Sequence, residues 1–304
     1  MTVGIIGYGS MGKMLLWKFA ENAGLDKQNI LVSNRTSDKL KEAEEAATIA
    51  DNRQVAGKAD ILFVCVRPVD LKNVLEDIKN DIKPDALLVS LNGSISFESI
   101  HKVISNKTAK VIPSITAEIG RSQTLVCFDD NATEKDKADL TQLLKNIGDV
   151  IELPEDEMGM GSELVSCMPG FIASIFDVIC TSAQDHTSLP KEQIVRMVLA
   201  TMSATGDLMI RKDMTFDDVV KRVATKGGIT EEGTKVVYEG FPQTADLLFE
   251  KTLEKRRLTA EAARKSFEVY CSYEDDQSRD GHAYRTGCHE HPQQPPLRRA
   301  CGGC

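Results

Sequence analysis

The sequence lacks any excess of positive charge. Its 304 residues carry 46 acidic and 37 basic side chains, which gives a formal net charge of −9 at pH 7 and an isoelectric point near 5.2. Proteins that bind nucleic acid usually present a basic face to its phosphates. The charge balance therefore argues against nucleic acid as the principal partner.

Long hydrophobic runs are also missing. No stretch approaches the length of about 18 uninterrupted apolar residues that indicates a membrane-spanning helix. Residues 1–6 enter a predicted strand without a basic leader or a cleavage site. We expect a cytoplasmic protein that contacts no membrane. With 41% hydrophobic residues, a chain of this length should form a globular protein of about two domains.

Closely spaced cysteines are missing from most of the sequence. Cys65, Cys127, Cys167 and Cys180 occur singly in apolar segments. A reduced thiol in such a place behaves as a small hydrophobic side chain. We interpret these four residues as part of the core, and we expect Cys167 to be a packed thiol rather than a nucleophile, because no histidine partner is apparent.

The tail, residues 273–304, differs in composition from the rest. Its one large aliphatic residue, Leu297, cannot bury enough apolar area to offset the entropy lost on ordering, so the tail is predicted to be disordered or a non-native extension. The alternative is a zinc site. Its ligands would come from Cys288, His289, Glu290, His291, Cys301 and Cys304. Only Cys301 and Cys304 have close spacing, so no metal site is predicted.

Apolar strand-like and helix-like segments alternate in the first half of the chain. The predicted strands are residues 2–6, 30–33, 61–66, 87–91, 110–112, 124–128 and 149–153, and the predicted helices are residues 13–22, 39–50, 69–79, 97–105 and 135–146. This alternation predicts an α/β fold with a doubly wound, mostly parallel sheet, because the connecting helices must cover both faces.

After residue 154 the pattern becomes helical only. Helical periodicity continues to about Phe267 and is interrupted at Pro169-Gly170, at residues 188–190 and at residues 226–228. We predict a Rossmann-type domain over residues 1–154 and an all-helical domain over residues 155–272, followed by the tail.

A glycine motif directly follows the first predicted strand and opens a helix. It consists of Gly7, Tyr8, Gly9, Ser10, Met11 and Gly12. In this context the pattern is the fingerprint of a dinucleotide site. Gly7 permits the tight turn, Gly9 lets the backbone approach a pyrophosphate, and Gly12 lets the helix pack closely on the strand. The alternative is a glycine-rich turn without a ligand.

The end of the second strand indicates which cofactor is bound. An NAD site usually has an acid there, whereas this chain has Asn34, Arg35 and Thr36, with no acid until Asp38. Arginine can bind a 2′-phosphate with two hydrogen bonds, so NADP(H) is favoured over NAD(H). A solvated surface arginine is the alternative. Further cofactor contacts are predicted from Val66, Arg67 and Pro68, which follow the third apolar strand.

Five motifs together are similar to those of the pyrroline-5-carboxylate reductase family. They are Gly7-Tyr-Gly-Ser-Met-Gly12, Asn34-Arg35, Cys65-Val-Arg-Pro68, Leu153-Pro-Glu-Asp-Glu157 and Val223-Ala-Thr-Lys-Gly-Gly-Ile-Thr230. The resemblance covers residues 1 to about 270. It implies a Rossmann domain joined to a helical domain, pairing of chains through the helical domain, and reduction of a cyclic imine to proline with NADPH or NADH.

The resemblance also implies a substrate site. In the family, a glycine-rich turn holds the substrate carboxylate on backbone N–H groups. Alignment of the glycines places Thr225 and Thr230 on the family's serine and last threonine, so Gly227, Gly228 and Thr230 are expected to bind substrate, with Thr225 and Thr230 as candidate catalytic residues. A helix start can hold an anion without a lysine. Alternatively, Thr230 only caps the helix, and the acids Glu231 and Glu232 oppose an anionic ligand.

Three positions depart from the family pattern. Ser114 replaces an amide expected beside the nicotinamide, Met168 replaces a glycine of the substrate motif, and Lys226 replaces a proline. The same changes resemble a divergent branch of the family associated with late competence in bacteria. Two alternatives therefore stay open. One is a reductase of another imine or keto acid, and the other is an NADP-binding regulatory paralogue with weakened catalysis.

No histidine is predicted to be catalytic. His101 and His186 fall in a surface helix and a loop, and a protonated imine needs little acid–base help to accept hydride. Apolar runs such as residues 171–179 and 194–199 exceed what a lone helical domain readily covers. We expect a homodimer or a higher homo-oligomer.

Overall fold

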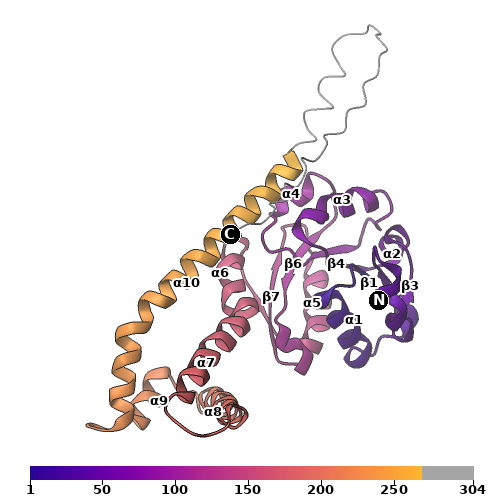
Figure 1. Cartoon of the computed structure of the whole chain (residues 1–304). Coiled ribbons are helices and arrows are strands. Elements are labelled where there is room, and N and C mark those ends of the chain that lie inside the picture. Colours follow the sequence, from indigo (N-terminus) through magenta and orange to yellow (C-terminus); the bar gives the residue numbers. More distant parts are fainter. Residues whose placement is uncertain (269–304) are drawn as a thin grey trace, which may run out of the picture. The chain divides into compact units, whose positions relative to one another are not determined.

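The alternating segments form one eight-stranded sheet in the computed structural model, which describes residues 1–268 (Figure 1). The strands are β1 (Val3–Ile6), β2 (Ile30–Ser33), β3 (Thr48–Ile49), β4 (Ile61–Val64), β5 (Leu87–Ser90), β6 (Thr108–Ile112), β7 (Ser122–Phe128) and β8 (Gly148–Glu152). Their order is β3-β2-β1-β4-β5-β6-β7-β8. All neighbouring strands are parallel except β6 and β7. The predicted fold class is confirmed.

Helices cover both faces of this sheet. They are α1 (Ser10–Asn22), α2 (Asn52–Lys58), α3 (Pro68–Ile78), α4 (Phe97–His101) and α5 (Glu134–Leu144). Leu15 of α1 and Leu140 of α5 belong to the core on one face. Leu71 of α3 and Ile100 of α4 belong to the core on the other face (Figure 1). Because both faces are covered, every residue of β1, β2, β4 and β5 is buried, which explains their continuous apolar sequences.

The predicted helix over residues 39–50 is wrong. Ser37–Glu45 forms a 3₁₀ helix, β3 follows at the sheet edge, and α2 begins at residue 52. The segment is rich in alanine, glutamate and lysine, but only Leu40 and Ala43 of the 3₁₀ helix are buried, and helix propensity without an apolar face is a weak determinant. The start of α2 has a capping box, in which Gln54 N–H donates to Asp51 at 2.8 Å.

All described elements after β8 are helical. They are a 3₁₀ turn (Glu155–Glu157), α6 (Met158–Ser162), a π-helical turn (Glu163–Cys167), α7 (Met168–Gln184), α8 (Lys191–Lys212), α9 (Phe216–Val223) and α10 (Ile229–Glu268). The predicted interruptions at residues 188–190 and 226–228 are confirmed. At Pro169-Gly170 the chain stays helical, but the helix type changes directly before Pro169, where the π-helical turn ends and α7 begins; the missing N–H of Pro169 costs little in this first turn.

Large apolar side chains of the helical segment are exposed in the single chain. Among them are Val178, Ile179, Met197, Leu199, Leu208, Ile210, Phe216, Val236, Val237, Tyr238, Phe241, Leu247 and Leu253. Within residues Glu155–Gln184 a window of 18 residues has a mean hydropathy of 1.8, so by length and composition alone this helical segment is apolar enough to cross a membrane. Only 6% of that window is buried within the chain. Apolar surface of this extent marks an interaction face.

The described residues up to Phe267 form one compact unit. Ala263 and Phe267, near the end of α10, pack into the core that also contains Leu71. The predicted domain boundary at residue 154 stays a prediction. The predictions for residues 273–304, including the alternative zinc ligands, lie outside the described residues. Within residues 1–268 there is no group of three or more histidine, cysteine or acidic side chains placed to hold a metal ion.

Candidate functional site

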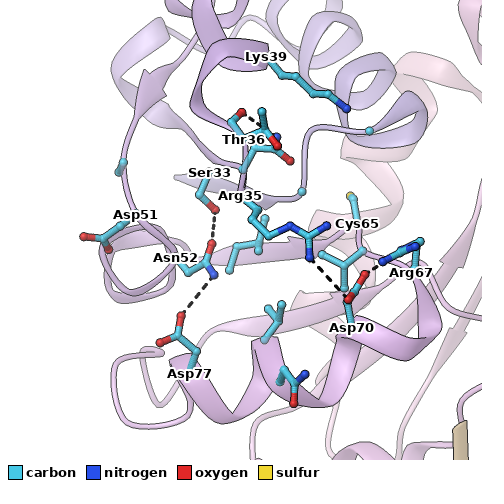
Figure 2. A pocket seen from close by; sticks show the side chains of 18 of the residues that line it. Ser33, Arg35, Thr36, Lys39, Asp51, Asn52, Cys65, Arg67, Asp70 and Asp77 are labelled. Carbon is cyan, nitrogen blue, oxygen red and sulfur yellow. Dashed lines mark hydrogen bonds and ion pairs between the residues drawn. The ribbon is translucent and has the colours of Figure 1, made fainter. Parts of the chain in front are cut away.

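A cavity of about 730 Å³ lies at the carboxyl ends of β1, β2 and β4 (Figure 2). In a parallel α/β sheet this edge is where ligands bind. Of the predicted cofactor residues, the cavity is lined by Gly7, Gly9, Asn34, Arg35, Thr36, Val66 and Arg67. These come from three loops that are far apart in the sequence, so the fold brings together what the motifs predicted separately.

The glycine loop is shaped to hold a diphosphate. Gly7 has φ of +100°, which disfavours any side chain, and a Cβ there would lie 2.6 Å from the carbonyl oxygen of Cys65. A Cβ on Gly9 would meet no atom within 4 Å, so the space beside this residue is open. Gly9 precedes α1 without any side-chain cap, and the first turn of α1 has no acid. Free N–H groups at such a helix start attract an anion.

The remaining residues of the glycine motif do not line the cavity. Gly12 is buried against the loop, since a Cβ there would lie 2.0 Å from the carbonyl oxygen of Gly7. Ser10 and Met11 begin α1. The Tyr8 side chain is buried, and its hydroxyl accepts a hydrogen bond from Trp17 Nε1 at 3.0 Å. Burial raises the pKa of Tyr8, so its hydroxyl is neutral at physiological pH.

Asn34 joins the glycine loop to the loop after β2. Its Oδ1 accepts a hydrogen bond from the Tyr8 backbone N–H at 3.0 Å, and its Nδ2 donates to the Thr36 carbonyl at 3.0 Å. The amide therefore fixes two backbone segments, while Arg35 beside it is 84% exposed and available to a ligand. Pro68 begins α3 directly after Arg67, which sets the path of the third loop.

Other residues that line the cavity belong to no sequence motif described above. They include Lys39, Asp51, Asn52, Arg53, Asp70, Asn73 and Asp77. Figure 2 shows Asn52 between Ser33 and Asp77, with Oγ of Ser33 2.7 Å from Oδ1 of Asn52. Lys39, in the 3₁₀ helix that follows the loop of Arg35, adds a second cation to the lining of the cavity. The capping box at Asp51 and Gln54 is a sequence signal that could have placed α2 at this edge.

The predicted substrate turn joins α9 to α10. Gly227 has φ of +75°, Gly228 N–H donates to the Thr225 carbonyl at 2.8 Å, and α10 begins at Ile229. A Cβ on Gly228 would lie 2.8 Å from the carbonyl oxygen of Thr225, so only glycine fits without a shift. Thr230 and Thr225 are exposed. None of the residues that line the dinucleotide cavity comes from this turn.

One protein carboxylate already contacts the turn. Gly227 N–H donates to Oε2 of Glu231 at 2.7 Å. The group that the resemblance assigns to a substrate carboxylate is therefore hydrogen-bonded to an acid of the first turn of α10 in this structure. A substrate carboxylate would have to displace Glu231 from Gly227.

Ser114 and Met168 both lie outside the dinucleotide cavity. Ser114 is 2% exposed and precedes a 3₁₀ helix (Ile115–Ile119), where its backbone N–H donates to Oγ of Ser122 at 3.0 Å. Met168 is half-buried and follows the π-helical turn. Neither lines the dinucleotide cavity, so their assignments to cofactor and substrate stay predictions.

A buried ion pair anchors the π-helical turn. Glu163 is 1% exposed, and its Oε1 accepts hydrogen bonds from Arg256 Nε at 3.1 Å and Nη2 at 2.8 Å. Arg256 also donates to Oγ of Ser162 at 3.0 Å. Burial, followed by the charge of Glu163, raises the pKa of Cys167. The thiol stays protonated at neutral pH, which is typical of a packed cysteine rather than a nucleophile.

His101 and three further cysteines, Cys65, Cys127 and Cys180, have structural positions. Nε2 of His101 lies 2.9 Å from Oδ2 of Asp129, and this contact joins α4 to the end of β7. Cys127 and Cys180 are buried, and Cys65 is partly buried. Burial raises the pKa of the Cys65 thiol, so this cysteine is also unreactive at neutral pH.

Comparisons with known proteins give two family models that match separate parts of the chain. Residues 2–93 match the model described as NADP oxidoreductase coenzyme F420-dependent, and residues 155–258 match the model described as pyrroline-5-carboxylate reductase dimerisation. The first match contains the glycine loop and the other two loops of the cavity. The second contains the turn at residues 225–230 and most of the exposed apolar helices.

Individual proteins match over most of their length. Pyrroline-5-carboxylate reductase 3 of Bacillus subtilis (strain 168) is 29% identical over 271 residues, which cover 86% of this chain and 98% of that protein. ComE operon protein 4 of the same organism is 27% identical and is covered completely, over 88% of this chain. The solved structure of Plasmodium falciparum pyrroline carboxylate reductase with NADP bound has a TM-score of 0.77 at 21% identity, over 86% of this chain and 98% of that one. At that identity the structure supports the fold alone.

Proposed function

The chain belongs to the pyrroline-5-carboxylate reductase family, so we propose that it reduces a cyclic imine carboxylate, 1-pyrroline-5-carboxylate, to proline with NADPH. Members of this family are NAD(P)H-dependent oxidoreductases that act on a C=N bond. The observation that carries the proposal is the glycine turn before α10, which offers backbone N–H groups and Thr230 together within the dimerisation match.

The cavity residues would hold the cofactor. The open side of Gly9 and the uncapped start of α1 suit a diphosphate, and Arg35 with Lys39 suits a 2′-phosphate, which favours NADPH. Once bound, NADPH supplies the hydride that the reaction needs. Family membership supports use of NAD(P)H, and the preference for NADPH is part of the proposal.

The turn residues would bind and orient the imine. The Gly227 N–H holds its carboxylate after Glu231 has moved away, while the Gly228 N–H stays on the Thr225 carbonyl and keeps the turn in shape. The Thr230 hydroxyl keeps a proton at the imine nitrogen. A protonated imine is already electrophilic, so orientation and exclusion of water supply most of the rate. A mechanism without a catalytic histidine agrees with the position of His101, whose ring is hydrogen-bonded to Asp129.

Replacing Thr230 with alanine is the first test. We expect robust oxidation of NADPH with 1-pyrroline-5-carboxylate by the wild type and a loss of at least tenfold in kcat for Thr230→Ala, about 1.4 kcal/mol of transition-state stabilisation. The assay follows the absorbance of the reduced nicotinamide. Thr234→Ala, one turn later on α10, is the matched control and should retain activity. Equal kcat in wild type and Thr230→Ala would contradict the role of the turn.

Two alternative functions are supported by the contact of Glu231 with the turn and by the similarity to ComE operon protein 4. Glu231 on Gly227 N–H opposes an anionic substrate, and ComE operon protein 4 is covered over its whole length. These observations favour an NADP-binding regulatory paralogue with weakened catalysis, or a reductase of another imine or keto acid. NADPH binding without turnover on a panel of imines and keto acids would support the regulatory function. Turnover of a different substrate would support the other reductase.

The same proposal includes a cytoplasmic homodimer. The exposed apolar side chains of α7 to α10 lie within residues that match the dimerisation model, so a second copy is the partner that would cover them. We expect light scattering to give twice the chain mass for the wild type, and a monomer or an aggregate for Val237→Glu, since Val237 is 56% exposed on α10. Lys58→Glu on α2 is the control and should stay dimeric. A monomeric wild type would contradict the proposal.

A further inference from the structure

Two arginines of the dinucleotide cavity converge on one carboxylate. Arg67, directly before α3, donates from Nε to Oδ2 of Asp70 at 2.8 Å. Arg35, from the loop after β2, has its Nη1 4.0 Å from Oδ1 of the same residue. Figure 2 shows Asp70 between the two guanidinium groups, with one oxygen turned toward each. Asp70 therefore links the loop after β2 to the loop after β4.

These contacts are too exposed to matter much for folding. The side chains of Arg35 and Arg67 are 84% and 70% exposed, and that of Asp70 is 30% exposed. Solvent screens ion pairs of this kind, and their contribution to stability is small. Asp70 also lies in the first turn of α3, where its backbone N–H donates to the Arg67 carbonyl at 2.9 Å, a contact that does not need the carboxylate. The side chain can therefore be changed without unfolding the loop.

The carboxylate has opposite effects on the two nicotinamide dinucleotides. NADP(H) carries a 2′-phosphate with a charge of about −1.5 to −2, which competes with Asp70 for Arg35 and is repelled by Asp70. NAD(H) carries no such phosphate, and with it Arg35 keeps Asp70 as its partner. When NAD(H) is bound, Asp70 therefore gives Arg35 an ionic partner in place of the missing phosphate.

We propose that Asp70 determines how strongly this site prefers NADPH over NADH, by pairing with Arg35 when no 2′-phosphate is present. The inference rests on the proposed function only in requiring a nicotinamide dinucleotide in the cavity. Asp70 thus keeps the enzyme able to use NADH, and removal of its charge shifts the preference toward NADPH.

Binding to Asp70→Asn, measured without any imine, tests this role. The single tryptophan, Trp17, hydrogen-bonds to Tyr8 beside the glycine loop, so its fluorescence can report the binding of either reduced dinucleotide to the full-length protein. We expect Kd for NADPH to fall at least threefold and Kd for NADH to stay equal or rise, so that the affinity ratio changes at least threefold. In an Arg35→Ala background the same substitution should change the ratio less than twofold.

Asp77→Asn is the matched control. Asp77 lines the same cavity but pairs with Arg53 and Asn52, so its loss removes an equal charge without freeing Arg35. An equal shift in this control, or a change below twofold in Asp70→Asn, overturns the proposal. Asp70→Ser repeats the test should the asparagine variant unfold. A wild type that binds neither dinucleotide refutes this inference together with the proposed function, whereas binding without turnover refutes only the proposed substrate.

Discussion

Replacement of Arg256 with alanine is expected to lower the free energy of unfolding by about 3–5 kcal/mol at neutral pH. Glu163 is 1% exposed, and its Oε1 accepts two hydrogen bonds from Arg256. Its second oxygen, Oε2, is buried and accepts no hydrogen bond from the residues that the structure describes. Without Arg256 a desolvated carboxylate would remain with no cation to offset the loss of water.

The adjacent arginine provides a matched control. Arg257 pairs with Glu254 and Glu261 on the surface of the same helix, and its side chain is 57% exposed. We expect Arg257→Ala to cost less than about 1 kcal/mol, because exposed ion pairs contribute little. Denaturant unfolding at one fixed protein concentration compares the two variants, since association would otherwise change the apparent stability.

A double variant separates loss of the pair from loss of packing. Glu163→Leu combined with Arg256→Met removes both charges and keeps apolar volume, so most of the stability should return. Equal losses in Arg256→Ala and Arg257→Ala would show that the buried pair does not stabilise this part of the fold. A double variant as unstable as Arg256→Ala would instead assign the loss to packing of the arginine side chain.

This ion pair also shows what the sequence alone could not reveal. Glu163 and Arg256 are 93 residues apart, and neither belongs to a motif. The glycine motif at residues 7–12 could be recognised because strand, turn and helix are adjacent in the chain, and each glycine has a local reason to be there. A pair formed across two helices depends on tertiary packing, which no local pattern specifies.

The dinucleotide site lies between these two cases. Arg35 and Arg67 were predicted from their positions after strands, and the cavity contains both. Asp70 and Lys39 were missed, because one lies within a helix start and the other lies in a segment predicted to be an ordinary helix. The edge strand β3 is only two residues long, and its pairing with β2 overrides the helix propensity of the surrounding residues.

Two alanine substitutions in the glycine motif are expected to weaken dinucleotide binding strongly and to differ in their effect on stability. In Gly12→Ala the new Cβ would lie 2.0 Å from the Gly7 carbonyl oxygen, so backbone must move. We expect a loss of about 1–3 kcal/mol in stability, as for other overpacked sites. We also expect a loss of at least about thirtyfold in dinucleotide affinity, or about 2 kcal/mol, because the displaced loop no longer aligns the start of α1.

Gly9→Ala should retain stability and still lose affinity. Its backbone has φ of −86°, which alanine adopts, and the added Cβ meets no protein atom within 4 Å. Stability should therefore change by less than about 0.5 kcal/mol. The methyl group instead fills the open space before the uncapped N–H groups of α1, where a diphosphate would approach, so affinity should again fall at least about thirtyfold. Thermal unfolding and Trp17 fluorescence titration measure the two quantities separately. If Gly9→Ala binds NADPH and NADH as tightly as the wild type, the diphosphate does not lie on this loop.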